Sequence, residues 1–246
     1  MFPKLRVQKY GGSSLNSIEK IKAIANQVAG DYQKGDRFLI VVSAMGETTD
    51  DLMRMAHEVS QKPLQRELDM LLTAGERISM ALMSLALNDL GVPAISFTGS
   101  QAGIMTCGTH GDASILEVKP IRVVEELKKD RVIVLAGFQG VDPVTKDVTT
   151  LGRGGSDTTA VSMASFFQCK VCEFKKDTEG VFDKDPNKDA SANHRELVTW
   201  DEIITLTKAG APFLHYKAAM LAKEKLLPLE ISHAHKPQGR KTIVKN

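Results

Sequence analysis

The fold is decided by Leu151-Gly152-Arg153-Gly154-Gly155-Ser156-Asp157-Thr158-Thr159-Ala160. Small and apolar residues follow, so a helix is predicted over 156–167, with Ser156 as the expected N-cap. Glycines before a helix N-terminus let backbone N–H groups approach an anion, and Arg153 adds a planar cation suited to a carboxylate or phosphate. Taken alone, the stretch more often indicates a simple glycine turn before an ordinary helix.

Strands and helices alternate on both sides of this stretch. Strands are predicted at 5–10, 38–42, 91–97, 132–138, 170–174, 229–232 and 242–245. Helices are predicted at 17–33, 51–88 with a break near Pro63, 118–130, 156–167, 200–209 and 215–225, and 140–155 is expected to be a polar link. Such alternation predicts an α/β fold, an αβα sandwich with a mostly parallel central sheet.

Composition excludes several classes of function. The 246 residues carry 32 basic and 30 acidic side chains, a balance that gives no reason to expect nucleic acid or a membrane surface as a partner. No uninterrupted run of about 18 apolar residues and no leader-like N-terminus is present, so a cytoplasmic protein is expected. His233 and His235 lack a third ligand nearby in the sequence, and no metal site is predicted.

A second glycine-rich segment, Gly11-Gly12-Ser13-Ser14, directly follows the first predicted strand and precedes a helix. This order is typical of loops whose backbone amides surround a phosphate. It differs from the P-loop pattern because Lys9 comes before the glycines, at the end of the strand. Lys9 could neutralise phosphate charge; an exposed strand-end lysine is an equally good interpretation.

Two further segments carry candidate polar groups. The loop 43–50 follows a buried strand, and ligands of open α/β sheets bind at the carboxyl ends of strands. Gly75-Glu76-Arg77 interrupts an apolar helix, which more often indicates a solvated face. Together these groups suit phosphoryl transfer, which mainly needs charge neutralisation and positioning. A carboxylate acceptor is already ionised and requires no general base.

The chain resembles aspartate kinase, of the amino acid kinase superfamily. The resemblance is carried by four segments in the same order and spacing, at 9–14, 42–49, 75–79 and 150–160. It implies an amino acid kinase-like αβα sandwich that converts ATP and L-aspartate to ADP and 4-phospho-L-aspartate, the first step towards lysine, threonine and methionine. It also implies Mg²⁺ held mainly by the phosphates and, by analogy, a homodimer.

The resemblance assigns roles to individual residues. The implied catalytic residues are Lys9, which contacts the transferred phosphate, and Asp157, which orients Lys9. The implied substrate-binding residues are Ser43, Thr48, Glu76 for the α-amino group, and Arg153 for the α-carboxylate. The implied nucleotide- or phosphate-binding residues are Lys9, Gly11, Gly12, Ser13, Gly154, Gly155, Ser156, Lys176, Asp177, Phe182 and Asp185. Residues 1–167 would form the substrate and phosphoryl-transfer lobe and 168–246 the nucleotide lobe of a single domain.

The sequence departs from the family pattern in the nucleotide lobe. Lys176 stands where a hydroxyl residue is usual, Asn187 where an arginine is usual and Pro212 where a lysine is usual. Two lost cations should weaken ATP binding, by about 1–3 kcal/mol each. The lysines that could compensate are Lys176, Lys184, Lys188 and Lys217.

These departures leave two alternatives to an active aspartate kinase. One is an amino-acid-binding protein with weak or lost kinase activity. The other is a related kinase for another small carboxylate, although Glu76 and Arg153 together favour an α-amino acid. The sequence contains no segment resembling the regulatory ACT domains of most aspartate kinases, so no inhibition by lysine or threonine is expected.

Overall fold

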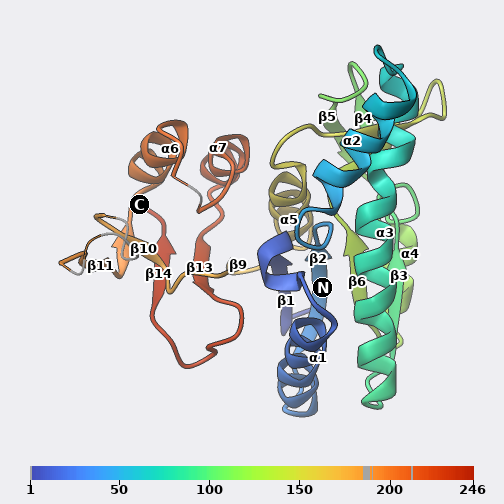
Figure 1. Cartoon of the computed structure of the whole chain (residues 1–246). Helices are drawn as coiled ribbons and strands as arrows, with labels where there is room; N and C mark the ends of the chain where they lie inside the picture. Colours follow the sequence, from blue (N-terminus) through green and yellow to red (C-terminus); the bar gives the residue numbers. More distant parts are fainter. Residues whose placement is uncertain (1, 185–188, 190, 212) are drawn as a thin grey trace.

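The computed structural model of the chain describes residues 2–184, 189, 191–211 and 213–246 (Figure 1). Its strands are β1 (Leu5–Tyr10), β2 (Arg37–Val42), β3 (Ala94–Phe97), β4 (Ile104–Cys107), β5 (Ser114–Val118), β6 (Val132–Ala136), β7 (Gln139–Val141), β8 (Val148–Thr150), β9 (Cys172–Lys176), β10 (Val181–Phe182), β11 (His194–Arg195), β12 (Leu197–Val198), β13 (Leu229–His233) and β14 (Lys241–Val244). Its helices are α1 (Ile18–Gln33), α2 (Thr48–Val59), α3 (Gln65–Asp89), α4 (Ile121–Leu127), α5 (Gly155–Phe166), α6 (Trp200–Lys208) and α7 (Tyr216–Glu224), with the 3-10 helix η1 (Gly12–Leu15).

An eight-stranded sheet in the order β12-β14-β13-β9-β1-β2-β6-β3 forms the centre of the fold. Every neighbouring pair in it is parallel except β13 and β14. The helices lie on both sides of this sheet (Figure 1). The predicted αβα sandwich with a mostly parallel sheet is therefore confirmed.

Alternating residues of the central strands supply the two halves of the core. In β2, Leu39 and Val41 join the apolar cluster to which α4, α5, α6 and α7 contribute. Phe38 and Ile40 point to the other face and pack with residues of α1 and α3. Because both faces are covered by helices, β2 is buried almost throughout, which explains its continuous apolar sequence.

The helix starts show where local prediction worked and where it failed. The N-cap of α1 is Ser17, whose side chain accepts a hydrogen bond from the Lys20 amide at 3.3 Å. The predicted N-cap Ser156 is wrong: α5 begins at Gly155 and is capped by Gly154, which has a φ of 75°. This left-handed residue turns the chain one step earlier, so that Ser156 already lies in the first helical turn.

The segment 140–155 also differs from the expected polar link. It contributes to the hairpin β7–β8, which belongs to a second, four-stranded sheet in the order β5-β4-β7-β8.

The helix α3 is long enough and apolar enough to cross a membrane, judged by length and composition alone. It instead packs along β3, β6 and β8 as part of this fold.

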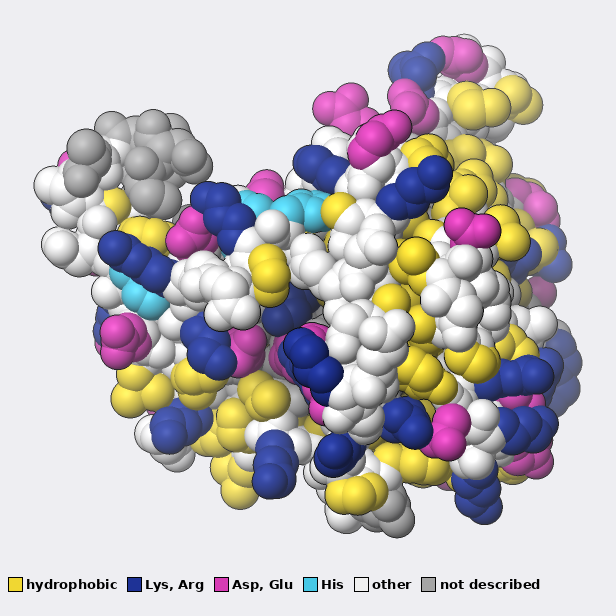
Figure 2. All heavy atoms as spheres, turned by 90° about the horizontal axis from the view of Figure 1, so that it is seen from below, with side chains coloured by type: hydrophobic (Ala, Val, Ile, Leu, Met, Phe, Trp, Pro, Cys, Tyr) yellow, Lys and Arg dark blue, Asp and Glu magenta, His cyan; other side chains and the backbone are white. Residues whose placement is uncertain are grey.

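The surface carries charges of both signs. Figure 2 shows basic and acidic side chains interspersed with apolar ones on the face that it draws, in agreement with the balanced charge.

The parallel strands bring their following loops together at one edge of the sheet. The Ser43 amide after β2 donates to the Tyr10 carbonyl at the end of β1 at 3.2 Å, and the Gly137 amide after β6 donates to Val42 at 3.0 Å. The loop after β2 also donates from Gly46 to the Gly12 carbonyl at 3.0 Å. These hydrogen bonds hold the two predicted loops, 11–14 and 43–50, side by side.

Candidate active site

A buried ion pair lies at the carboxyl edge of the sheet. Lys9, at the end of β1, places its Nζ 2.6 Å from Asp157 Oδ1 in the first turn of α5, and both side chains are less than a tenth exposed. Asp157 Oδ2 accepts a hydrogen bond from the His215 amide at 2.8 Å. Burial alone would raise the pKa of Asp157, but the Lys9 and Lys176 ammoniums outweigh it and lower this pKa to about 2. Asp157 is therefore ionised at neutral pH and pairs with Lys9.

The glycine loop after β1 is packed tightly against the loop after β2. A Cβ at Gly12 would lie 2.7 Å from the Ala44 carbonyl oxygen, so the approach of the two loops requires glycine. Gly11 is buried beside Lys9. Ser13 is exposed instead, and its carbonyl accepts a hydrogen bond from Lys20 at 3.0 Å. Lys9 and Gly12 line a cleft at this edge of the sheet, whereas Ser13 does not.

Glu76 is a buried carboxylate on the opposite wall of this cleft. Its Oε1 accepts a hydrogen bond from the Ala44 amide at 3.1 Å, and its Oε2 has no hydrogen-bond partner among the described residues. Gly75 lets α3 come this close, because a Cβ there would lie 2.8 Å from Ala44 Cβ. Burial raises the pKa of Glu76 to about 7, against the lowering effect of the hydrogen bonds it accepts. A charged segment such as Gly75-Glu76-Arg77 more often lies on a solvated face, but here Glu76 is buried.

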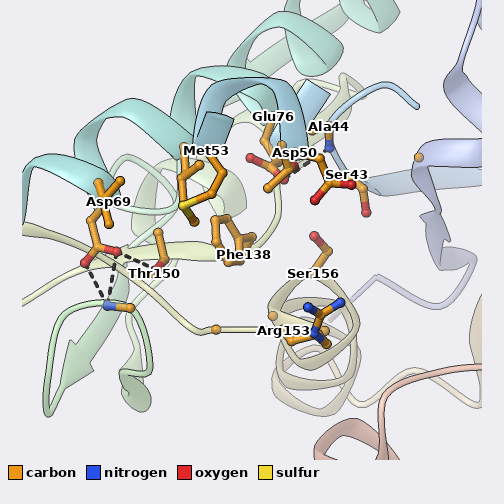
Figure 3. Close-up of a pocket in the computed structure, with 18 of the residues that line it drawn as sticks. Ser43, Ala44, Asp50, Met53, Asp69, Glu76, Phe138, Thr150, Arg153 and Ser156 are labelled. Atoms are coloured by element: carbon orange, nitrogen blue, oxygen red, sulfur yellow. Dashed lines mark hydrogen bonds between the residues drawn. The ribbon is translucent and has the colours of Figure 1, made fainter. Parts of the chain in front are cut away.

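The cleft encloses about 570 Å³ between these groups. In Figure 3, Glu76 and Ser43 lie on one side, and Ser156 and Arg153 lie on the other. Arg153 is exposed and makes no ion pair with an acid in the described part of the chain. Gly154 and Gly155 complete this wall at the N-terminus of α5. A buried carboxyl group and an exposed guanidinium thus face each other across the cleft.

Gly154 carries the sharpest steric requirement in the cleft. Its φ is 75°, and a Cβ there would lie 2.1 Å from His215 Cβ. Gly210 has a φ of 94° but nothing within 4 Å of its would-be Cβ. We expect Gly154→Ala to lower the free energy of unfolding by about 2–4 kcal/mol and Gly210→Ala by only about 1 kcal/mol. Urea unfolding of both variants measures the difference, and equal losses would show that the contact with His215 is easily relieved.

Thr48 does not line the cleft. It begins α2, and its Oγ1 donates to the Met45 carbonyl at 2.6 Å. The next residues along α2, Thr49, Asp50 and Met53, line the cleft in its place, and Phe138 closes its floor. Thr49 and Asp50 lie in the predicted loop 43–50, but the sequence did not single them out, since a hydroxyl at a helix start has equal signal at 48 and 49. Met53 and Phe138 carry no motif and were missed.

Asp69 is a supporting residue that the sequence also did not reveal. It is 1% exposed on α3 and accepts hydrogen bonds from Thr150 Oγ1 at 2.6 Å and the Gly111 amide at 3.1 Å. Nδ1 of His110 lies 2.6 Å from Oδ2 of the same carboxylate. Asp69 therefore fixes the loop around Gly111 against the strand that leads to Arg153 (Figure 3). An acid in a helix that is apolar on one side gives no sequence signal of burial.

The predicted nucleotide residues lie beyond Lys9, on and after β9. Lys176 ends β9 and is partly buried, whereas Asp177 is exposed. Phe182 packs edge-on against His194, with ring centroids 5.4 Å apart. None of the three lines the main cleft. Asp185, Asn187 and Pro212 lie outside the described residues. In the part of the chain that the structure describes, no three His, Cys, Asp or Glu side chains group to hold a metal.

Comparison with known proteins places this geometry in context. The sequence model described as "Amino acid kinase family" matches residues 4–232. Aspartokinase from Mycobacterium tuberculosis is 46% identical over 98% of this chain and 57% of its own length. Aspartokinase 2 from Bacillus subtilis is 44% identical over 92% of this chain and 55% of its own length. The chain spans a little more than half the length of the curated relatives that it matches.

Solved structures agree with these relatives. Aspartate kinase from Synechocystis superposes with a TM-score of 0.84 at 39% identity, covering 98% of this chain and 40% of that chain. E. coli aspartokinase III in complex with aspartate and ADP superposes with a TM-score of 0.87 over 98% of this chain and 64% of that chain. Its 21% identity makes it evidence for the fold alone.

Proposed function

The chain belongs to the amino acid kinase family, and we propose that its cleft transfers the γ-phosphoryl group of ATP to the side-chain carboxylate of L-aspartate, giving 4-phospho-L-aspartate. The observation that carries the proposal is Oε2 of Glu76, which is buried with no partner among the described residues. A buried carboxylate oxygen without a partner is costly, and the α-ammonium of an amino acid would satisfy it. The similarity to aspartokinases supports L-aspartate as this amino acid.

Recognition of the substrate rests on the two opposed charges. Glu76 would accept the α-ammonium, and Arg153 would bind the α-carboxylate through its planar fork of donors. Ser43, half-buried beside Glu76 in Figure 3, would donate to the same ligand. Held by both groups on its Cα, the amino acid would direct its side-chain carboxylate toward Lys9 and the N-terminus of α5.

Phosphoryl transfer would then proceed without a general base, because the attacking carboxylate is ionised. Lys9 would stabilise the negative charge on the transferred group, and Asp157 would keep the lysine charged and oriented. Backbone amides of Gly11, Gly12 and the first turn of α5 would add donors. The main work of the site is positioning and charge neutralisation, which the buried ion pair favours.

The nucleotide, the metal and the assembly belong to the same proposal. ATP would bind in the half of the chain from residue 168 onward, with Mg²⁺ coordinated mainly by its phosphates. The metal would act by neutralising phosphate charge, since the described residues offer no ready-made cluster of protein ligands for it. We further propose a cytoplasmic homodimer that acts in the first step of lysine, threonine and methionine synthesis.

The test is ATP-dependent formation of an acyl phosphate, trapped with hydroxylamine, with L-aspartate, L-glutamate and N-acetyl-L-glutamate as separate substrates. We expect product with L-aspartate only, because glutamate is longer by one methylene and acetylation removes the ammonium that Glu76 would bind. Product with another carboxylate and none with aspartate would assign a related kinase. Aspartate binding by calorimetry without any product would replace the kinase with an amino-acid-binding protein.

A further inference from the structure

We propose that Lys176 contacts the phosphates of the bound nucleotide together with Lys9, and so supplies a cation that the altered nucleotide loop lacks. This inference rests on the proposed function, since it requires a nucleotide at this edge of the sheet. The nucleotide lobe carries the uncharged Asn187 and Pro212 at two positions where the resemblance to aspartate kinases led us to expect cations. The sequence left four lysines as candidates to compensate, and the structure separates them.

The strand register places Lys176 beside Lys9. β9 lies next to β1 and runs parallel to it, with Phe174 paired to Lys9. Lys176 is two residues beyond Phe174, so its side chain points to the same face of the sheet as that of Lys9. Its backbone is fixed by a hydrogen bond from the Ala234 amide to its carbonyl at 2.7 Å. Two lysines from neighbouring strands thus project toward the N-terminus of α5.

The other candidates are engaged elsewhere. Lys184 is exposed and bound to Asp189 at 3.0 Å, and Lys217 is bound to Asp112 at 2.6 Å. Lys188 lies outside the described residues. Lys176, by contrast, makes no ion pair with any acid that the structure describes, although it is partly buried. The nearest buried anion, Asp157, is already paired with Lys9, so Lys176 is incompletely neutralised and an anionic ligand would be favoured beside it.

The charges around Lys176 favour an anion in particular. The charged or titratable groups that face it are Lys9 from β1, Asp157 from α5, its neighbour Asp177 and, across the strand pair, His233 of β13. Two ammoniums share the one buried carboxylate of Asp157, which leaves a local positive excess at a helix N-terminus. Burial and the nearby Lys9 lower the pKa of Lys176 to about 8. The charge on Lys176 is therefore present below about pH 8 and lost above it.

The test measures binding of a non-hydrolysable ATP analogue with Mg²⁺ by calorimetry, without aspartate, from neutral to alkaline pH. We expect Lys176→Met to weaken nucleotide binding about tenfold to a hundredfold at neutral pH and to leave aspartate binding unchanged. Wild-type affinity should fall as pH rises through the pKa of Lys176. Lys176→Arg should keep the affinity and remove this alkaline decline, because arginine stays charged. His233 has a pKa lowered by burial and cannot produce a decline in this range.

Lys184→Met is the matched control, since it removes an exposed lysine from the same region, and it should bind the analogue as wild type does. Thermal unfolding checks that each variant is folded. Unchanged nucleotide affinity in Lys176→Met would overturn the inference, as would an alkaline decline that persists in Lys176→Arg. Binding that depends on Lys176, but without acyl-phosphate formation, would support the inference and overturn the kinase. No binding of the analogue by wild type would overturn both.

Discussion

Replacing Lys9 with alanine is expected to lower kcat for acyl-phosphate formation by at least about a thousandfold, because the ammonium is the main positive charge at the point of transfer. Lys9 is 5% exposed and lies 2.6 Å from Asp157, so its ammonium is held in one place by a buried partner, which a cation from solution would lack. The variant should still bind L-aspartate, since Glu76 and Arg153 are unchanged. The kcat from the hydroxylamine assay and the aspartate Kd from calorimetry test these two statements separately.

The same substitution leaves Asp157 buried without its closest cation. In wild type the pKa of Asp157 is about 2 instead of 3.8, so its ionised form contributes roughly 2 kcal/mol of stability above the unfolded pKa, which is lost as pH falls through the folded pKa. Lys9→Ala should therefore melt lower at neutral pH, and adding Asp157→Asn should restore part of the loss without restoring turnover. Turnover near the wild-type rate in either variant would remove Lys9 from the mechanism.

The charged groups of the site could be predicted from the sequence because they lie in or next to glycine-rich segments. Lys9 and Asp157 meet as expected, since one ends a strand and the other begins a helix at the same edge of the sheet. Glu76 was ambiguous, because a charged residue in a helix is usually solvated, and only the approach of Ala44 to Gly75 buries it. That contact joins segments far apart in the chain, so the residues around Glu76 could not predict its burial.

The supports of the site could not be predicted, for related reasons. β7 and β8 have three residues each, too few for an alternating pattern to be recognised. Asp69 is buried by a loop 42 residues away along the chain, and nothing near it in the sequence indicates this. The N-cap of α5 was misplaced because Gly154 is left-handed and packs closely against His215, a residue from a distant part of the chain. Central elements such as β2 and α1 were predicted well, since burial on one or both faces leaves a direct pattern of apolar residues.

Glu76→Gln is expected to weaken L-aspartate binding about a hundredfold while making the free protein more stable at alkaline pH. The folded pKa of Glu76 is about 7 and its ordinary value is 4.5. Between these values the unfolded chain is ionised and the folded one is protonated, so wild-type stability falls as pH rises through this window, by up to about 3 kcal/mol. A neutral amide has no such dependence. Thermal unfolding across the window should show wild type losing stability and the variant remaining level.

Aspartate binding should show the opposite pH trend. The α-ammonium of the substrate requires the ionised carboxylate, so wild-type affinity should rise with pH until Glu76 is fully ionised at a pH above about 7. Glu76→Gln should bind weakly at every pH in this range. Glu67→Gln is the control, because Glu67 is exposed on the same helix and paired with Arg66. If Glu76→Gln binds aspartate as tightly as this control, Glu76 does not hold the ammonium. If Glu76→Gln is no more stable than wild type at alkaline pH, ionisation of Glu76 does not destabilise the free protein. Both results together would mean that the cleft recognises its ligand without a contribution from Glu76.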